Sequence, residues 1–135
     1  MANIDVRTVS TAALAYFGDS VIELLVRRRL VGEGYASSKS LNAHARKFVS
    51  APAQAAAMQR LLPHLDEDEA AVFRRGRNIG HTNTPKNATV AEYRSATGME
   101  TLFGYLYLTA RETRAAQLFD LAYGNENTNH EETQA

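Results

Sequence analysis

Apolar residues recur at helical spacing along almost the whole chain, and no stretch alternates between apolar and polar residues as a strand does. The stretch "AYFGDSVIELLV" (15–26) lies in the first helical region, which we place from about Ser10 to Val31. Gly18 is a candidate kink inside this region, and "GEGY" (32–35) is its stop signal. The hydrophobic pattern therefore predicts an all-α protein.

Residues that favour the start of a helix, each followed by apolar residues at helical spacing, predict five further helices. Ser37 or Ser38 caps the second helix, and Pro52 suits the first turn of the third. Asp66 and Glu69 have the spacing of a capping box before the fourth, "DEDEAAVFRR" (66–75). Thr89 begins the fifth. A break near Thr109 precedes the sixth, which we expect to end near Tyr123. The apolar side of the second helix holds Leu41, Ala45, Phe48 and Val49.

One long polar segment interrupts the helices. "GRNIGHTNTPKNAT" (76–89) contains two glycines, a proline and several Asn and Thr residues, which favour turns and caps. A loop of this length is unusual inside a compact helical domain and favours a functional role. The polar residues after Gly124 are expected to form a disordered tail.

Length and composition limit the class of protein. At 135 residues and 44% hydrophobic composition, the chain is expected to form one domain over 1–123, followed by the tail, 124–135. The absence of cysteine excludes disulfides, thiolate metal sites and a thiol nucleophile. No apolar run is long enough to span a membrane, and the first ten residues lack the order of a secretory signal. We therefore expect a cytoplasmic protein without a membrane partner.

The formal net charge of zero conceals a segregation of charge. Residues 1–123 hold 15 basic residues against 12 acids, a net charge of +3, and residues 74–94 hold five basic residues against one acid. A local basic patch matters more for phosphate binding than the total does. A second basic run, "RRRLV" (27–31), either extends such a surface or is a solvated helix end.

Acidic residues stand inside two apolar helical segments. Asp19 and Glu23 are spaced i and i+4 on one helix face, and Glu100 lies in "ATGMETLFGYLYL" (96–108). Helices that cross can bring such acids together, and a hard divalent ion such as Mg²⁺ then relieves their repulsion. The alternative is that Glu23 and Glu100 lie on solvated edges while Asp19 caps a helix that starts at Ser20.

"RRGRN" (74–78) and "TPKN" (84–87) place basic residues at the two ends of the long loop. Guanidinium groups bind phosphates in a bidentate manner, and Asn, Thr and backbone N–H groups add neutral donors. Carboxylates for Mg²⁺ beside a basic loop are what metal-assisted phosphodiester cleavage requires. The alternative is a solvated loop with ordinary surface charge.

Together these segments resemble the ribonuclease III family. "LAYFGDSVIELLV" resembles its signature helix, and "RRGRN", "TPKN" and "YRSATGMETLFGYLYL" resemble the second half of its catalytic domain. The resemblance covers about residues 10–123 and is strongest to the Mini-ribonuclease III branch, which has no double-stranded-RNA-binding domain. It implies a ribonuclease III-like endonuclease domain, a helical bundle that forms a homodimer.

The resemblance also implies an activity. It implies a Mg²⁺-dependent endoribonuclease, with Mn²⁺ as an alternative ion, that cleaves double-stranded RNA to 5′-phosphate and 3′-hydroxyl ends, with precursor 23S ribosomal RNA as the substrate. By position, Asp19 and Glu100 are the catalytic and metal-binding residues, and Tyr16 is a dimer-interface residue. The residues assigned to RNA binding are Arg74, Arg75, Arg77, Asn78, Thr84, Lys86, Asn87, Tyr93 and Arg94.

Two positions depart from ribonuclease III proper. Ala15 stands where that enzyme has a glutamate, and Thr97 stands where it has an aspartate. The Mini branch typically lacks both acids, so the departures support the assignment and leave two strong ligands, with Glu23 as a hypothetical outer participant. The rival functions are a non-catalytic RNA-binding dimer acting in ribosome assembly and a helical protein-interaction module.

Overall fold

A computed structural model describes residues 3–79 and 86–124, and within these ranges the chain forms helices and no strand. The elements, in chain order, are η1 (Val6–Thr8), α1 (Thr11–Gly32), α2 (Ser38–Val49), α3 (Ala51–Leu61), η2 (Leu62–His64), α4 (Glu67–Arg77), α5 (Val90–Leu108) and α6 (Glu112–Tyr123). The all-α prediction is confirmed. None of the described helices combines the length and apolar character needed to cross a membrane.

Side-chain caps fix where most of the helices begin. Ser10 and Ser37 accept hydrogen bonds from backbone N–H groups of α1 and α2, which satisfies donors that have no partner within the helix. The predicted capping box of Asp66 and Glu69 opens α4. Thr89 opens α5 as predicted, through a capping box of its own with Glu92.

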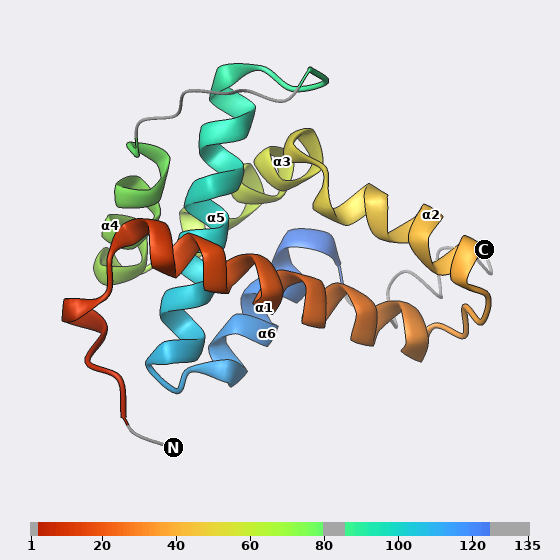
Figure 1. Cartoon of the computed structure of the whole chain (residues 1–135), viewed down its shortest axis with the longest axis horizontal. Helices are drawn as coiled ribbons and strands as arrows, with labels where there is room; N and C mark the ends of the chain where they lie inside the picture. Colours follow the sequence, from red (N-terminus) through yellow and green to blue (C-terminus); the bar gives the residue numbers. More distant parts are fainter. Residues whose placement is uncertain (1–2, 80–85, 125–135) are drawn as a thin grey trace.

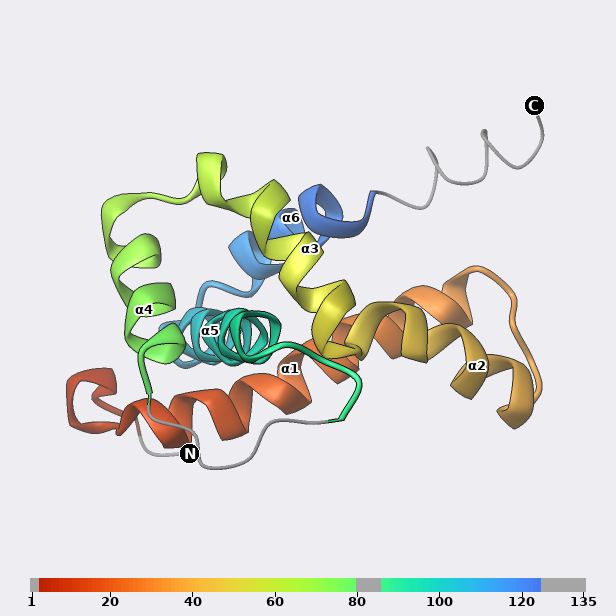
Figure 2. The ribbon, with the colours of Figure 1, turned by 90° about the horizontal axis from the view of Figure 1, so that it is seen from above.

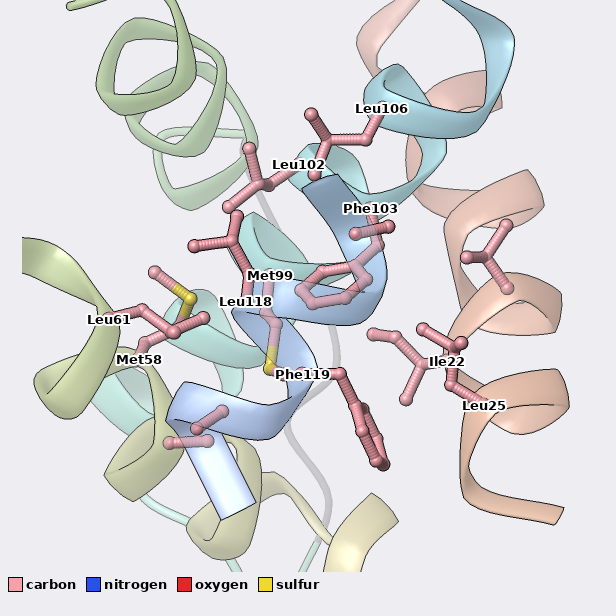
Figure 3. Packing of buried hydrophobic residues seen from close by; sticks show 14 of the residues in the cluster. Ile22, Leu25, Met58, Leu61, Met99, Leu102, Phe103, Leu106, Leu118 and Phe119 are labelled. Carbon is pink, nitrogen blue, oxygen red and sulfur yellow. The ribbon is translucent and has the colours of Figure 1, made fainter. Parts of the chain in front are cut away.

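The hydrophobic core is built around α5. In Figure 1 this helix runs down the middle of the molecule and α1 crosses it, and Figure 2 shows α4 and α3 on other sides of α5. Met99, Phe103 and Leu106 of α5 are fully buried, and Figure 3 shows how the core side chains from α1, α3 and α6 meet them. Burial of this apolar area is the main stabilising contribution to the fold.

Three local details differ from the sequence expectations. The first helix is continuous from Thr11 to Gly32, so Gly18 does not interrupt it. The fourth helix continues through Arg77, so the loop between α4 and α5 starts later than predicted. Leu62–His64 forms a 3₁₀ turn that the sequence did not indicate. The expected disorder of the tail concerns residues that lie outside the described range.

Candidate catalytic site

The candidate site lies where α1 crosses α5. The two backbones touch at Gly18, because a Cβ atom on this residue would lie 1.6 Å from the carbonyl oxygen of Glu100. Gly104 is the second contact, since a Cβ there would lie 2.2 Å from the carbonyl oxygen of Leu14. Only glycine permits this approach, and the carboxylate-bearing residues Asp19 and Glu100 flank it.

The Asp19 and Glu100 side chains meet at the crossing. Asp19 is exposed, whereas Glu100 is largely buried. Burial, together with a hydrogen bond to Asp19 and the negative charge of Asp19, raises the pKa of Glu100 to about 8. The described surroundings of the pair thus supply too little positive charge to offset the two carboxylates. A carboxyl pKa raised in this way is typical of functional sites.

These positions exclude two parts of the alternative interpretation of the acids. Asp19 lies in the interior of α1, so it does not cap a helix starting at Ser20. Glu100 faces Asp19 and does not lie on a solvated edge. Glu23 forms an ion pair with Arg27 of the same helix, with 2.8 Å between Nη2 and Oε2. The structure thus brings together Asp19 and Glu100, while Glu23 has its own partner.

The donor set at the crossing is small. Within the described residues no group of three or more Asp, Glu, His or Cys side chains is arranged to hold a metal ion. The buried hydroxyl of Thr97 donates to the Tyr93 carbonyl at 3.1 Å, so it is committed to its own helix. Two carboxylates suit a hard divalent cation that retains several water ligands, which describes Mg²⁺.

Most of the described residues assigned to RNA binding lie at the two ends of the segment that joins α4 to α5. Arg74, Arg75 and Arg77 are exposed in the last turn of α4, where positive charge also favours the helix C-terminus, and Asn78 is the C-cap. Arg77 therefore belongs to the helix, which corrects its placement in the loop predicted to begin at Gly76. Lys86 and Asn87 are exposed before α5, and Thr84 lies outside the described residues.

Contacts hold some of these side chains in place. Arg75 donates from Nη2 to Oγ1 of Thr11 at 2.9 Å, which joins α4 to the start of α1. The Arg77 guanidinium lies 5.7 Å from the centre of the Phe73 ring, within cation–π range. In the first turns of α5, Arg94 is exposed and Tyr93 is half-buried. The contact between Arg75 and Thr11 had no signal in the sequence.

Exposed apolar side chains gather on the outward part of α1. Tyr16 is 86% exposed, Leu24 54% and Val31 64%, and Phe17 is also partly exposed. A patch of large apolar side chains on a protein surface is typical of an interface with another protein. Tyr16 is three residues before Asp19, so this face adjoins the carboxylate pair.

Comparison with known proteins links this geometry to one family. The family model described as "Ribonuclease III domain" matches residues 12–111. The chain is 44% identical to the Mini-ribonuclease 3 of Symbiobacterium thermophilum over 85% of this chain and 88% of that protein. It is 38% identical to the Mini-ribonuclease 3 of Brevibacillus brevis over 88% and 89%, respectively. A crystal structure of a Fusobacterium nucleatum protein superposes with a TM-score of 0.77 at 30% identity, over 87% of this chain and 93% of that one.

Proposed function

The chain belongs to the ribonuclease III family and is an endoribonuclease of its Mini-ribonuclease III branch, and we propose that Asp19 and Glu100 form its catalytic site. The observation that supports the proposal is the carboxylate pair at the α1–α5 crossing, where the pKa of Glu100 is raised to about 8. The proposed activity is Mg²⁺-dependent cleavage of double-stranded RNA to 5′-phosphate and 3′-hydroxyl ends. Mn²⁺ is the proposed alternative ion.

The carboxylates would hold the ion, and the helix crossing would position them. When bound, Mg²⁺ supplies Lewis-acid polarisation of the scissile phosphate and lowers the pKa of a coordinated water. Asp19 would contribute an exposed oxygen ligand. Glu100 would contribute a largely buried ligand, because a nearby cation would offset the burial and the charge of Asp19 that disfavour its ionised form.

The arginines at the end of α4 are proposed to bind the RNA backbone. Arg74, Arg75 and Arg77 are exposed and carry rigid, bidentate donors, so they can bind phosphates of an RNA backbone. Asn78, Thr84, Lys86, Asn87, Tyr93 and Arg94 complete the proposed RNA-binding set. Recognition of this kind follows the shape of the A-form duplex and its 2′-hydroxyl groups more than base sequence.

A homodimer is part of the proposal. The exposed side chains of Tyr16, Leu24 and Val31 would be covered by a second copy of the chain, which would place two carboxylate pairs in one assembly. The proposed cellular substrate is precursor 23S ribosomal RNA, in line with the resemblance of the whole chain to the Mini-ribonuclease III branch. Accumulation of uncleaved precursor in cells that lack the protein would support this substrate, and normal maturation would exclude it.

Cleavage of a long RNA duplex tests the catalytic assignment. Asp19→Asn and Glu100→Gln should each abolish Mg²⁺-dependent cleavage while leaving RNA binding and the folded state largely intact. Glu23→Gln is the matched control, because it removes a carboxylate one turn away that is already paired with Arg27. It should cleave at close to the wild-type rate. If Asp19→Asn or Glu100→Gln cleaves at that rate, the carboxylate pair is not the catalytic site.

A further inference from the structure

Positive charge is concentrated in a part of the chain that the proposed cleavage site does not use. Seven of the 15 Lys and Arg residues lie within residues 27–65, and Glu33 is the one acid in that range. Residues 34–65 contain no acid at all. The range 27–65 carries a net charge of +6, against +4 for the shorter range 74–94 around the α4–α5 loop, yet none of its residues belongs to the proposed RNA-binding set.

Three of the seven cations have structural partners. Arg29 is buried, donates to Glu33 and to the Gly124 carbonyl, and lies over the Phe48 ring. Arg27 is paired with Glu23, and Arg60 donates to the Ala122 carbonyl at 2.5 Å. These side chains stabilise α1 or the end of α6. The remaining four are Arg28, Lys39, Arg46 and Lys47.

Lys39, Arg46 and Lys47 form a solvent-facing set on α2, which we name the α2 stripe. Lys39 and Arg46 are seven residues apart, so they lie on the same face of the helix, about 10 Å apart along its axis. Leu41, Ala45 and Phe48 pack against the core from the opposite side. All three stripe side chains are exposed, and in the described part of the chain none of them forms an ion pair with an acid.

The surface of α2 favours a polyanion over a protein partner. Protein interfaces are rich in aromatic and apolar side chains at their centre and poor in lysine. Among the described residues, the exposed large apolar side chains lie on other segments, and α2 contributes none. Cations without an acidic partner, spread over two helical turns, are instead suited to the backbone of a duplex, which carries one phosphate charge about every 1.7 Å of its axis.

The position of α2 places the stripe away from the carboxylate pair. The helix packs along α1, and Figure 1 shows it beside the C-terminal half of α1, on the same side of α1 as the N-terminal end of α5. The arginines of α4 lie toward the other end of α1, where Arg75 contacts Thr11. Positive charge is thus available at two separate places along α1.

We propose that the α2 stripe binds the phosphate backbone of duplex RNA outside the segment that is cleaved. The proposal rests on the proposed function, because it takes the same duplex as the ligand. Contacts of this type add affinity and a salt dependence but no base specificity, since phosphates are the same at every position. They would make binding depend on duplex length while leaving the chemical step unchanged.

Binding to RNA duplexes of two lengths tests the proposal. The variant is Lys39→Gln with Arg46→Gln, and the matched control is Arg7→Gln with Arg111→Gln, which removes the same charge from two exposed positions elsewhere. Binding is measured with chelator present, using a duplex of one helical turn and one of several turns. Thermal unfolding and size-exclusion chromatography monitor folding and oligomeric state.

The stripe variant should bind the long duplex roughly tenfold more weakly at physiological salt, and the slope of log K against log salt should become shallower by about 1.4 to 1.8. Its affinity for the short duplex and its cleavage rate at saturating enzyme should match the wild type. Wild-type affinity and slope on the long duplex would overturn the proposal, and so would an equal loss on both lengths. A changed oligomeric state would identify the stripe as a protein contact instead. If the wild-type chain does not cleave duplex RNA, the proposed function is wrong. If it cleaves the duplex but the stripe variant binds as the wild type does, only the proposal for the α2 stripe is wrong.

Discussion

The backbone of Gly18 lies directly against the carbonyl of Glu100, so the residue before one acid touches the other acid. A side chain at position 18 would force α1 and α5 apart, and the same displacement would separate the two carboxylates. The closeness of the helices and the closeness of Asp19 to Glu100 are therefore one structural feature.

Gly18→Ala tests this relationship. The added methyl group would lie 1.6 Å from a backbone oxygen, which cannot move aside as a flexible side chain can. We expect a loss of about 1–3 kcal/mol in the free energy of unfolding and a large loss of cleavage. Urea unfolding and a duplex cleavage assay measure the two effects.

The control for this substitution is Gly32→Ala at the exposed end of the same helix. Alanine has the higher helix propensity, so this change should be neutral or slightly stabilising and should leave cleavage unchanged. A Gly18→Ala protein as stable as the Gly32→Ala protein would show that α1 and α5 do not need to touch.

The raised pKa of Glu100 makes the stability of the metal-free protein depend on pH. The carboxyl titrates near 4.5 in the unfolded chain and at about 8 in the folded chain. Between these values the folded state holds a proton that the unfolded state has lost, so stability falls as pH rises, by at most about 1.4 kcal/mol per pH unit. Urea unfolding with chelator present should therefore show lower stability at about pH 8 than at about pH 5.

Two variants separate Glu100 from other groups that titrate. Glu100→Gln cannot ionise, so its stability should vary less with pH and should exceed that of the wild type near pH 8. Asp19→Asn should keep much of the slope, because burial is the largest cause of the shift and remains in place. Equal slopes in the wild type and in Glu100→Gln would rule out Glu100 as the source.

The sequence predicted the helix starts well because the signals are local. Ser10, Asp66 and Thr89 cap helices through residues within three positions of themselves, and a short window contains the whole interaction. Tertiary contacts produced the errors. Gly18 and Gly76 suggested a kink and a loop start, but each lies inside a helix at a close contact, against Glu100 and Thr101, respectively.

In the candidate site, too, local features were predicted and features set by tertiary contacts were not. Two acids within apolar segments indicated that Asp19 and Glu100 meet, and the structure brings them together. The pattern did not distinguish Glu23 from the pair, because the choice depends on the rotation of α1 and on the ion pair with Arg27. The hydrogen bond from Arg75 to Thr11 joins residues 64 positions apart, and nothing in the sequence around either residue indicates the other as its partner.

An ion pair between buried Glu69 and partly exposed Arg114 is expected to stabilise the fold. Glu69 is 1% exposed, and the arginine donates to both of its carboxylate oxygens, at 2.8 and 2.9 Å. Arg114→Ala leaves the buried carboxylate without its cation and should lower the free energy of unfolding by about 3 kcal/mol. Urea unfolding near neutral pH measures the change.

Two comparisons make this prediction specific. Arg7→Ala breaks an exposed ion pair with Asp5 and should have little effect on stability. Arginine lowers the pKa of Glu69, so the stabilisation should be present above pH 4.5 and should be lost as pH falls through the lowered pKa. An Arg114→Ala protein as stable as the Arg7→Ala protein at neutral pH would contradict the assignment.

The exposed Tyr16 side chain predicts a dimer that depends on α1. Tyr16→Ala removes a large aromatic group that is 86% exposed in the single chain, so it should change the stability of the subunit little. In a homodimer the same group would be a central contact, where truncation typically costs more than about 2 kcal/mol. Analytical ultracentrifugation should therefore show a dissociation constant raised by at least thirtyfold, an order-of-magnitude figure from that energy.

The matched control is Leu121→Ala, because Leu121 is an exposed apolar residue on α6 and not on α1. It should leave the dimer unchanged. Cleavage by Tyr16→Ala should recover when the protein concentration is raised above the new dissociation constant, since the carboxylate pair itself is intact. A wild-type chain that sediments as a monomer while cleaving at full rate would remove the dimer from the proposed function, and equal weakening by both substitutions would show that α1 is not the interface.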